Sequence, residues 1–352
     1  MMRRDKEVPG VRILCFVVFL AFTLCWLFLQ RELVVCAICS LSHTKDTISR
    51  FSFLYVSVLL LCIVLLFVPV SRSLFKYRNG QYACNYAVSA FLLGCLTGFD
   101  GEHFFSQNVT VWITGASLLA LVLAVPKIVS FLNRPASYNV PRTYASNFMI
   151  LTILFCITAV TGNTDENLHR RLRIEKMVSK GDFAGALKVG ADEEETDSAI
   201  TLLRVKAMLG MDTANPGTGV GEHLFQYPIY DTEVLMDSLA VLERDSVYDC
   251  RTVQIALAML GMDIQRADSL ITPLISEGNM PAYYMQSLVL SENSEAAALL
   301  SDEYESEQKN YGSFTETLNR FRNEPVQVRA NATFMDYGQT YYWYYTFCKF
   351  FL

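Results

Sequence analysis

Five apolar stretches in the first 162 residues constrain this chain more than any other feature. Each is 16 to 20 residues long, and none contains Asp, Glu, Lys, Arg or His. A helix needs about 20 apolar residues to cross the hydrocarbon of a bilayer. The sequence therefore predicts five transmembrane helices, at residues 13–29, 51–70, 82–98, 109–125 and 147–162.

The first stretch also fits the apolar part of a signal peptide, because Arg3, Arg4 and Lys6 precede it. No small-x-small cleavage site follows, however, and the polar residues 30–32 come directly after it. We therefore expect a retained helix. In the third stretch Asn85, Ser89 and Gly94 interrupt the apolar run, so their polar atoms must find partners on neighbouring helices.

Charge divides the chain into two parts at residue 162. Residues 1–162 carry 13 Lys+Arg and 6 Asp+Glu, a net charge of +7, whereas residues 163–352 carry 16 and 29, a net charge of −13. With a cytoplasmic N-terminus, ten basic residues lie on inside segments and three on outside loops, which fits the positive-inside rule. The acidic part then lies in the periplasm, although three arginines directly after the last stretch favour the opposite orientation.

The acidic part, residues 163–333, shows short amphipathic helices separated by Gly, Asp and Pro. Residues 181–187 (Gly-Asp-Phe-Ala-Gly-Ala-Leu) place a turn before a helix, as in a tetratricopeptide (TPR) unit. The hexapeptide Ala-Met-Leu-Gly-Met-Asp occurs at 207–212 and again at 258–263, and we expect each Gly to end a helix in the left-handed conformation. Residues 214–219 are then an insertion, and further helices are expected at 231–243, 265–275, 281–290, 294–307 and 313–322. The predicted fold is all-α, a transmembrane bundle followed by a TPR-like α-solenoid.

The chain ends with an aromatic tail, residues 334–352, in which ten of 19 residues are Phe, Tyr or Trp. Such residues favour the boundary between hydrocarbon and water. We expect Tyr337, Tyr341, Trp343 and Tyr345 to dock on the membrane helices or the headgroup layer, or to cap the last helical repeat.

The order of several N-terminal spans, the 181–187 motif and the Tyr-Gly-x-Thr-Tyr-x-x-Tyr-Tyr motif at 337–345 resembles a family of Bacteroidota membrane proteins of unknown function. The resemblance implies an inner-membrane location and a TPR-like domain outside the membrane. It supplies no catalytic residue.

Cys36 and Cys39 are spaced for a redox disulfide and follow the first stretch on the expected outer side. They are similar to the pair of quinone-linked, disulfide-generating membrane enzymes, but the outer loop at 99–108 lacks the second pair that such enzymes need. Eight of the ten cysteines lie before residue 163, in or beside the apolar stretches, where packing explains them equally well.

The sequence offers little evidence for a metal site, an acid/base site or nucleic-acid binding. The four histidines are scattered without metal-ligand spacing, so no metal and no cofactor is expected. Residues 100–103 (Asp-Gly-Glu-His) form either an acid/base or metal loop or a solvated loop, and the acidic run at 192–197 either begins a helix or docks a partner. The net charge of −13 disfavours nucleic acid. We therefore expect a non-enzymatic scaffold that contacts the lipid bilayer and envelope proteins; the alternative is a thiol–disulfide oxidoreductase that uses Cys36 and Cys39.

Overall fold

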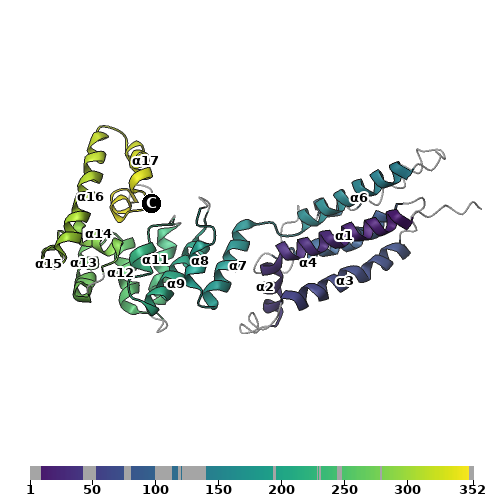
Figure 1. Cartoon of the computed structure of the whole chain (residues 1–352), viewed down its shortest axis with the longest axis horizontal. Helices are drawn as coiled ribbons and strands as arrows, with labels where there is room; N and C mark the ends of the chain where they lie inside the picture. Colours follow the sequence, from purple (N-terminus) through teal and green to yellow (C-terminus); the bar gives the residue numbers. More distant parts are fainter. Residues whose placement is uncertain are drawn as a thin grey trace, which may run out of the picture. The chain divides into compact units, whose positions relative to one another are not determined.

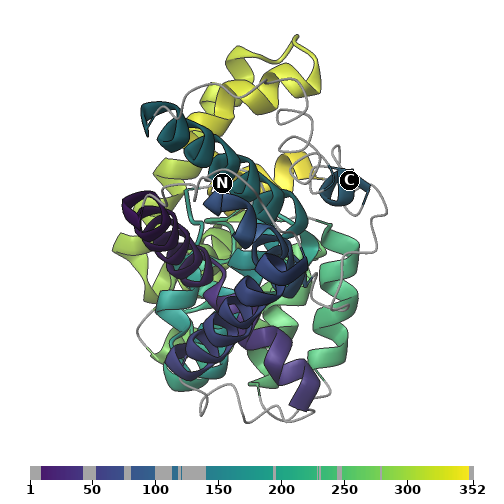
Figure 2. The same cartoon turned by 90° about the vertical axis from the view of Figure 1, so that its right-hand side faces the viewer.

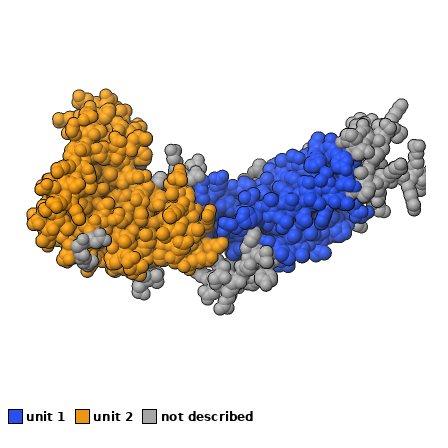
Figure 3. All heavy atoms as spheres, in the orientation of Figure 1, with its two compact units in different colours: residues 1–172 blue, residues 173–352 orange. Residues whose placement is uncertain are grey.

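A computed structural model of the chain shows two compact units, residues 1–172 and 173–352 (Figures 1 and 3). It describes residues 9–42, 53–74, 81–99, 113–117, 120, 140–192, 196–227, 229, 231–243, 248–277 and 280–348. Over these residues all regular structure is helical, and no strand is present (Figure 2). The all-α prediction is therefore confirmed. The units divide ten residues later than the predicted boundary at 162.

In unit 1 the predicted apolar stretches form helices wherever the structure describes them. They are α1 (Pro9–Leu29), α3 (Phe53–Leu74), η2 (Tyr82–Tyr86) with α4 (Ala87–Leu96), and α6 (Val140–Thr161). A helix that the sequence analysis did not expect, α2 (Arg31–Ser42), follows α1 directly. Of the fourth stretch, 109–125, only residues 113–117 and 120 are described, and 113–117 are helical.

Polar contacts show that α1, α4 and α6 run in the same direction. At one end, Ala83 N of η2, which precedes α4, donates to Asn147 Oδ1 of α6 at 2.8 Å, and a Cβ added to Gly10 of α1 would lie 3.1 Å from Tyr144 Oη of α6. Beyond their last residues, Gln30 Nε2 donates to Asn163 O at 2.7 Å, and Asn163 Nδ2 donates to Phe99 O at 2.9 Å. The helices of the first, third and fifth predicted stretches are thus parallel.

Close packing in unit 1 depends on small and hydroxylated residues. A Cβ added to Gly94 of α4 would lie 1.8 Å from Thr161 Oγ1 of α6, so only glycine allows these helices to approach. Thr158 Oγ1 donates to Ala90 O at 3.0 Å, and Ser89 Oγ donates to Val64 O of α3 at 2.8 Å. The polar atom of Ser89 has therefore found the partner on a neighbouring helix that the sequence analysis expected.

Two helices of the described residues are long and apolar enough to span a membrane, over Gly10–Leu29 and Thr143–Thr161. Ser57–Pro69 and Tyr82–Leu96 are shorter apolar helical segments. The structure thus has two candidate spans, which correspond to the first and fifth of the five predicted stretches.

Unit 2 is a succession of short helices around one core. They are the second half of α7 (Glu166–Ser179), α8 (Phe183–Lys188), α9 (Ser198–Ala214), α10 (Val220–His223), α11 (Thr232–Leu242), α12 (Cys250–Leu260), α13 (Ile264–Ile271), η3 (Thr272–Glu277), α14 (Ala282–Leu290), α15 (Ser294–Leu299), α16 (Ser301–Arg320), α17 (Val326–Tyr337) and α18 (Tyr341–Phe347). From α11 to α14, each helix packs on the next along the chain. Asp197, in the acidic run, begins α9 by accepting from Ile200 N at 2.7 Å.

One turn geometry joins three helix pairs of unit 2, namely α7–α8, α12–α13 and α14–α15. In each, a left-handed residue follows the first helix, at Gly181 (φ 75°), Met262 (φ 57°) and Glu292 (φ 56°). The next residue is Asp182, Asp263 or Asn293, and its side chain caps the second helix. The repeated unit is therefore a left-handed turn followed by an Asp or Asn cap.

Two expectations about these helices are wrong. In the first hexapeptide copy Gly210 does not end a helix: α9 continues to Ala214, and the ring of Phe183 packs where a side chain at 210 would stand. In the second copy Gly261 has φ −76°, and Met262 is the left-handed residue. The expected helices at 294–307 and 313–322 are instead α15 and α16, which meet at Leu300, and Gly312 lies inside α16.

Candidate functional site

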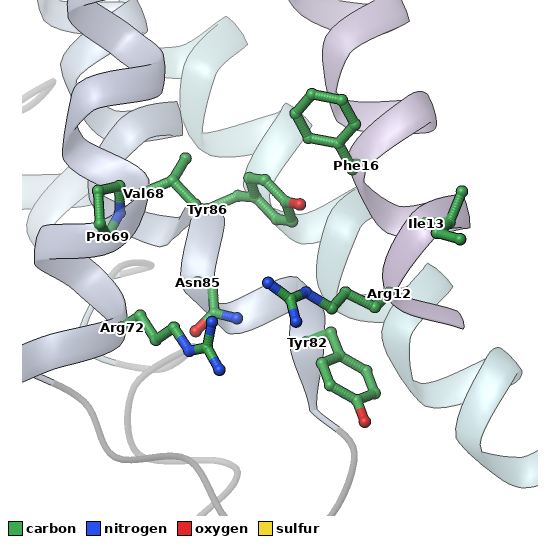
Figure 4. A pocket seen from close by; sticks show the side chains of 9 residues that line it. All are labelled: Arg12, Ile13, Phe16, Val68, Pro69, Arg72, Tyr82, Asn85 and Tyr86. Carbon is green, nitrogen blue, oxygen red and sulfur yellow. The ribbon is translucent and has the colours of Figure 1, made fainter. Parts of the chain in front are cut away.

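A recess in unit 1 lies between α1, the end of α3 and η2. It has a volume of about 580 Å³. Figure 4 shows the guanidinium groups of Arg12 and Arg72 pointing toward each other across Asn85. The remaining lining side chains are mostly apolar: Ile13, Phe16, Val68, Pro69, Tyr82 and Tyr86. The pocket is thus cationic and polar at one side and apolar at the other.

Each arginine lies at the end of its helix, where the apolar run of the sequence stops. Arg12 lies in the first turn of α1, and Arg72 lies in the last turn of α3. Because α3 runs opposite to α1, these two ends meet, and η2 brings Asn85 between them. The arrangement concentrates two positive charges and one amide at the start of α1.

The arginines of the pocket have no carboxylate partner within the described part of the chain. The ion pairs of unit 1 over these residues join Arg31 to Glu32 at 3.0 Å and Arg170 to Glu166 at 2.9 Å. Arg12 and Arg72 take part in neither. The pocket can therefore accept an anion, because its own described residues supply no negative charge.

Sequence reasoning did not single out this pocket. It counted Arg12 and Arg72 as loop charges and Asn85 as an interruption of an apolar stretch. One signal was present: an Asn near the beginning of a stretch, with arginines at the ends of two other stretches. Only the antiparallel packing of α1 and α3 shows that they meet.

The predicted redox pair lies on α2. Cys36 is half-buried and packs on the cluster of Leu33, Phe99, Leu168 and Leu172. The side chain of Cys39 lies outside the described residues, so the redox alternative stays a prediction. The cysteines described in unit 1 are otherwise spread over the helices, as packing residues are.

The four residues of the aromatic tail that were predicted to make docking contacts lie on α17 and α18, within unit 2. Tyr341 is fully buried, and its ring stacks on Phe225 with centroids 5.1 Å apart. Trp343 is half-buried and donates from Nε1 to Ala330 O at 3.2 Å. Tyr337 meets Phe314 edge to face at 5.2 Å, and Tyr345 lies 6.2 Å from Tyr341.

Hydrogen bonds fix α18 to the rest of unit 2. Gln286 Oε1 accepts from Tyr341 N at 2.8 Å, Tyr344 Oη donates to Leu260 O at 2.9 Å, and Tyr342 Oη donates to Glu307. Burial raises the pKa of the Tyr341, Tyr342 and Tyr344 phenols well above the usual value. These groups have the character of a core, not of a reactive site.

Acidic and metal-ligand side chains were the remaining candidates for chemistry. No cluster of three His, Cys, Asp or Glu side chains that could hold a metal ion occurs among those residues. Residues 100–103, the acidic loop of the sequence analysis, lie outside the described residues.

The buried carboxylate of Asp212 accepts from Gly219 N at 2.7 Å and from Val220 N at 2.8 Å, and so holds the 215–219 loop on α9.

Comparison with protein-family models, with curated proteins and with solved structures found no match to this chain.

Proposed function

We propose that this protein is a non-enzymatic scaffold of the bacterial inner membrane. Unit 1 anchors it through several helices, with the N-terminus in the cytoplasm, and unit 2 presents a TPR-like platform to protein partners in the periplasm. The observation that carries the proposal is the placement of exposed apolar side chains. Of the 20 large hydrophobic side chains exposed in the described residues, 14 belong to unit 1.

These 14 side chains lie on faces that point away from the core of unit 1. On α1 they include Ile13 at 63% exposure, Phe28 at 58% and Leu29 at 68%. Soluble proteins seldom expose so much contiguous apolar surface. Lipid tails are the solvent in which such a surface is stable, which supports membrane insertion of α1, α3 and α6.

The direction of the helices supports five crossings. Since α4 and α6 run in parallel, the chain between them must return to the other end of the bundle. The apolar stretch 109–125 lies within this connection and is long enough to make the return inside the membrane. An odd number of crossings places unit 2 on the side opposite to the N-terminus.

The platform role of unit 2 is supported by its three identical turns, because helix pairs joined in one geometry stack into extended surfaces. Apolar groups for a partner are present on α17, where Val328, Phe334 and Met335 are exposed, Met335 to 90%. The resemblance to Bacteroidota membrane proteins is part of the same proposal.

Two measurements test the anchor. Washing membranes with alkaline carbonate should leave the full chain in the membrane fraction. Phosphatase fusions after residue 162 should be active in the periplasm, whereas fusions after residue 78 should be inactive. Extraction by carbonate, or activity only after residue 78, would refute the anchor and its orientation.

Cross-linking in intact cells tests the platform. The full chain should capture a reproducible envelope protein, and Met335→Asp should lower the yield. Asn319→Asp, at an exposed polar position of α16, is the control and should not. If Met335→Asp captures the partner as well as the wild type does, α17 is not part of the partner surface. Turnover of a small molecule without capture of any protein would refute the scaffold function.

A further inference from the structure

We propose that the pocket of Arg12, Arg72 and Asn85 binds the headgroup of an anionic phospholipid. The proposal rests on membrane insertion of unit 1 and adds a ligand that the scaffold role does not require. It places the lipid phosphate between the two guanidinium groups. One acyl chain then lies along Ile13, Phe16 and Val68.

The depth of the pocket fits a headgroup. Helix α1 has 21 residues and is therefore about 30 Å long, close to the thickness of the hydrocarbon layer. Arg12 lies in its first turn, so a membrane-spanning α1 places this guanidinium at the boundary between lipid tails and headgroups. Arg72, two residues before the end of α3, lines the same pocket and so lies at the same level.

The chemistry of the lining matches a phosphate diester. Guanidinium groups bind phosphate oxygens with two parallel hydrogen bonds, and basic pockets between membrane helices favour anionic headgroups. The Asn85 amide adds a donor between the two arginines. Within the described residues no carboxylate competes, since Glu32 and Glu166 pair with other arginines.

The apolar side of the pocket distinguishes a lipid from a free anion. Ile13 is 63% exposed and Phe16 is 42% exposed, and both belong to the pocket lining. A soluble phosphate would leave these side chains uncovered, whereas a lipid covers them with its acyl chain. The volume of about 580 Å³ is also in the range of small-molecule sites, roughly 300–1,000 Å³.

The experiment measures lipid bound to the full chain, purified in detergent, by native mass spectrometry. Phosphatidylglycerol is compared with phosphatidylcholine of the same acyl chains and with inorganic phosphate. The wild type should bind phosphatidylglycerol in preference to both. Removing two headgroup-level charges with Arg12→Gln and Arg72→Gln should weaken phosphatidylglycerol binding by about 30-fold.

Two further variants make the result specific. Arg31→Gln with Arg170→Gln also removes two charges from unit 1, but outside the pocket, and should leave the preference intact. Arg12→Lys with Arg72→Lys keeps the charge without the planar fork and should give an intermediate loss. Both pocket arginines are exposed, so the variants should melt like the wild type.

Each unfavourable outcome has a separate meaning. Equal binding of the two lipids, unchanged binding in the Gln variant, or equally tight binding of inorganic phosphate would overturn the lipid site. In all three cases a protein that resists carbonate extraction still retains its membrane anchor. Carbonate extraction of the wild type would overturn the proposed function itself.

Discussion

Two tyrosines of α18 provide a sharp test of how unit 2 is stabilised. Tyr341 and Tyr344 are both buried and both contact the ring of Phe225, with centroids 5.1 and 4.7 Å away. Their hydroxyl groups differ. Tyr344 Oη donates to Leu260 O at 2.9 Å, whereas Tyr341 Oη has no hydrogen-bond partner among the described residues.

The two Phe variants should therefore have different effects on the stability of unit 2. Tyr344→Phe removes a buried hydrogen bond and leaves Leu260 O without it, which costs about 1–3 kcal/mol. Tyr341→Phe removes a buried polar group that has no partner, which should be neutral or stabilise by about 1–2 kcal/mol. The rings and their stacking remain in both variants.

Scanning calorimetry and hydrogen exchange of the full chain in detergent measure this difference. In a unit of this size, 1 kcal/mol shifts the melting temperature by about 2–4 °C. Tyr344→Phe should melt several degrees below the wild type and speed exchange in α12 and α14, and Tyr341→Phe should not. Equal destabilisation by both substitutions would refute the argument, because it would mean that the Tyr341 hydroxyl is satisfied.

Three other predictions follow from the fold. Glu292→Gly should stabilise unit 2 by up to about 1 kcal/mol in calorimetry, because an exposed non-glycine residue with φ 56° is strained; a lower melting temperature would contradict this. Gly94→Leu should abolish the accumulation of folded protein in membranes, since its Cβ would lie 1.8 Å from Thr161 Oγ1, whereas Gly312→Leu, with nothing within 4 Å, should accumulate normally. The third concerns pH: burial raises the pKa of the α18 tyrosines in the folded state above the usual value of about 10. Their contribution to stability is therefore complete below pH 10 and is lost as the pH rises further. The protection of unit 2 against hydrogen exchange, relative to an unfolded chain at the same pH, should fall there; unchanged protection at pH 11 would disprove it.

Sequence alone determined that the apolar stretches of unit 1 are helical where the structure describes them and that the fold is all-α, but it did not predict α2. Apolar stretches without charges and the periodicity of apolar residues are local properties, so they do not depend on distant contacts. The turn at 181–187 was predicted for the same reason, because Gly181 and the cap of Asp182 lie next to each other in the chain.

Tertiary structure decided what the local pattern left open. Identical hexapeptides at 207–212 and 258–263 have different structures. In the first copy the ring of Phe183 covers Gly210 and the helix continues, whereas the second copy ends its helix. The break at Leu300 likewise separates α15, which packs on η3, from α16, which packs on α14.

The pocket shows the same division. The sequence places Arg12 and Arg72 at the ends of two apolar stretches and so predicts that each lies near a membrane surface. That both reach one recess, with Asn85 between them, depends on α1 and α3 running in opposite directions beside η2. Proximity between residues 60 positions apart is set by packing, which no local pattern contains.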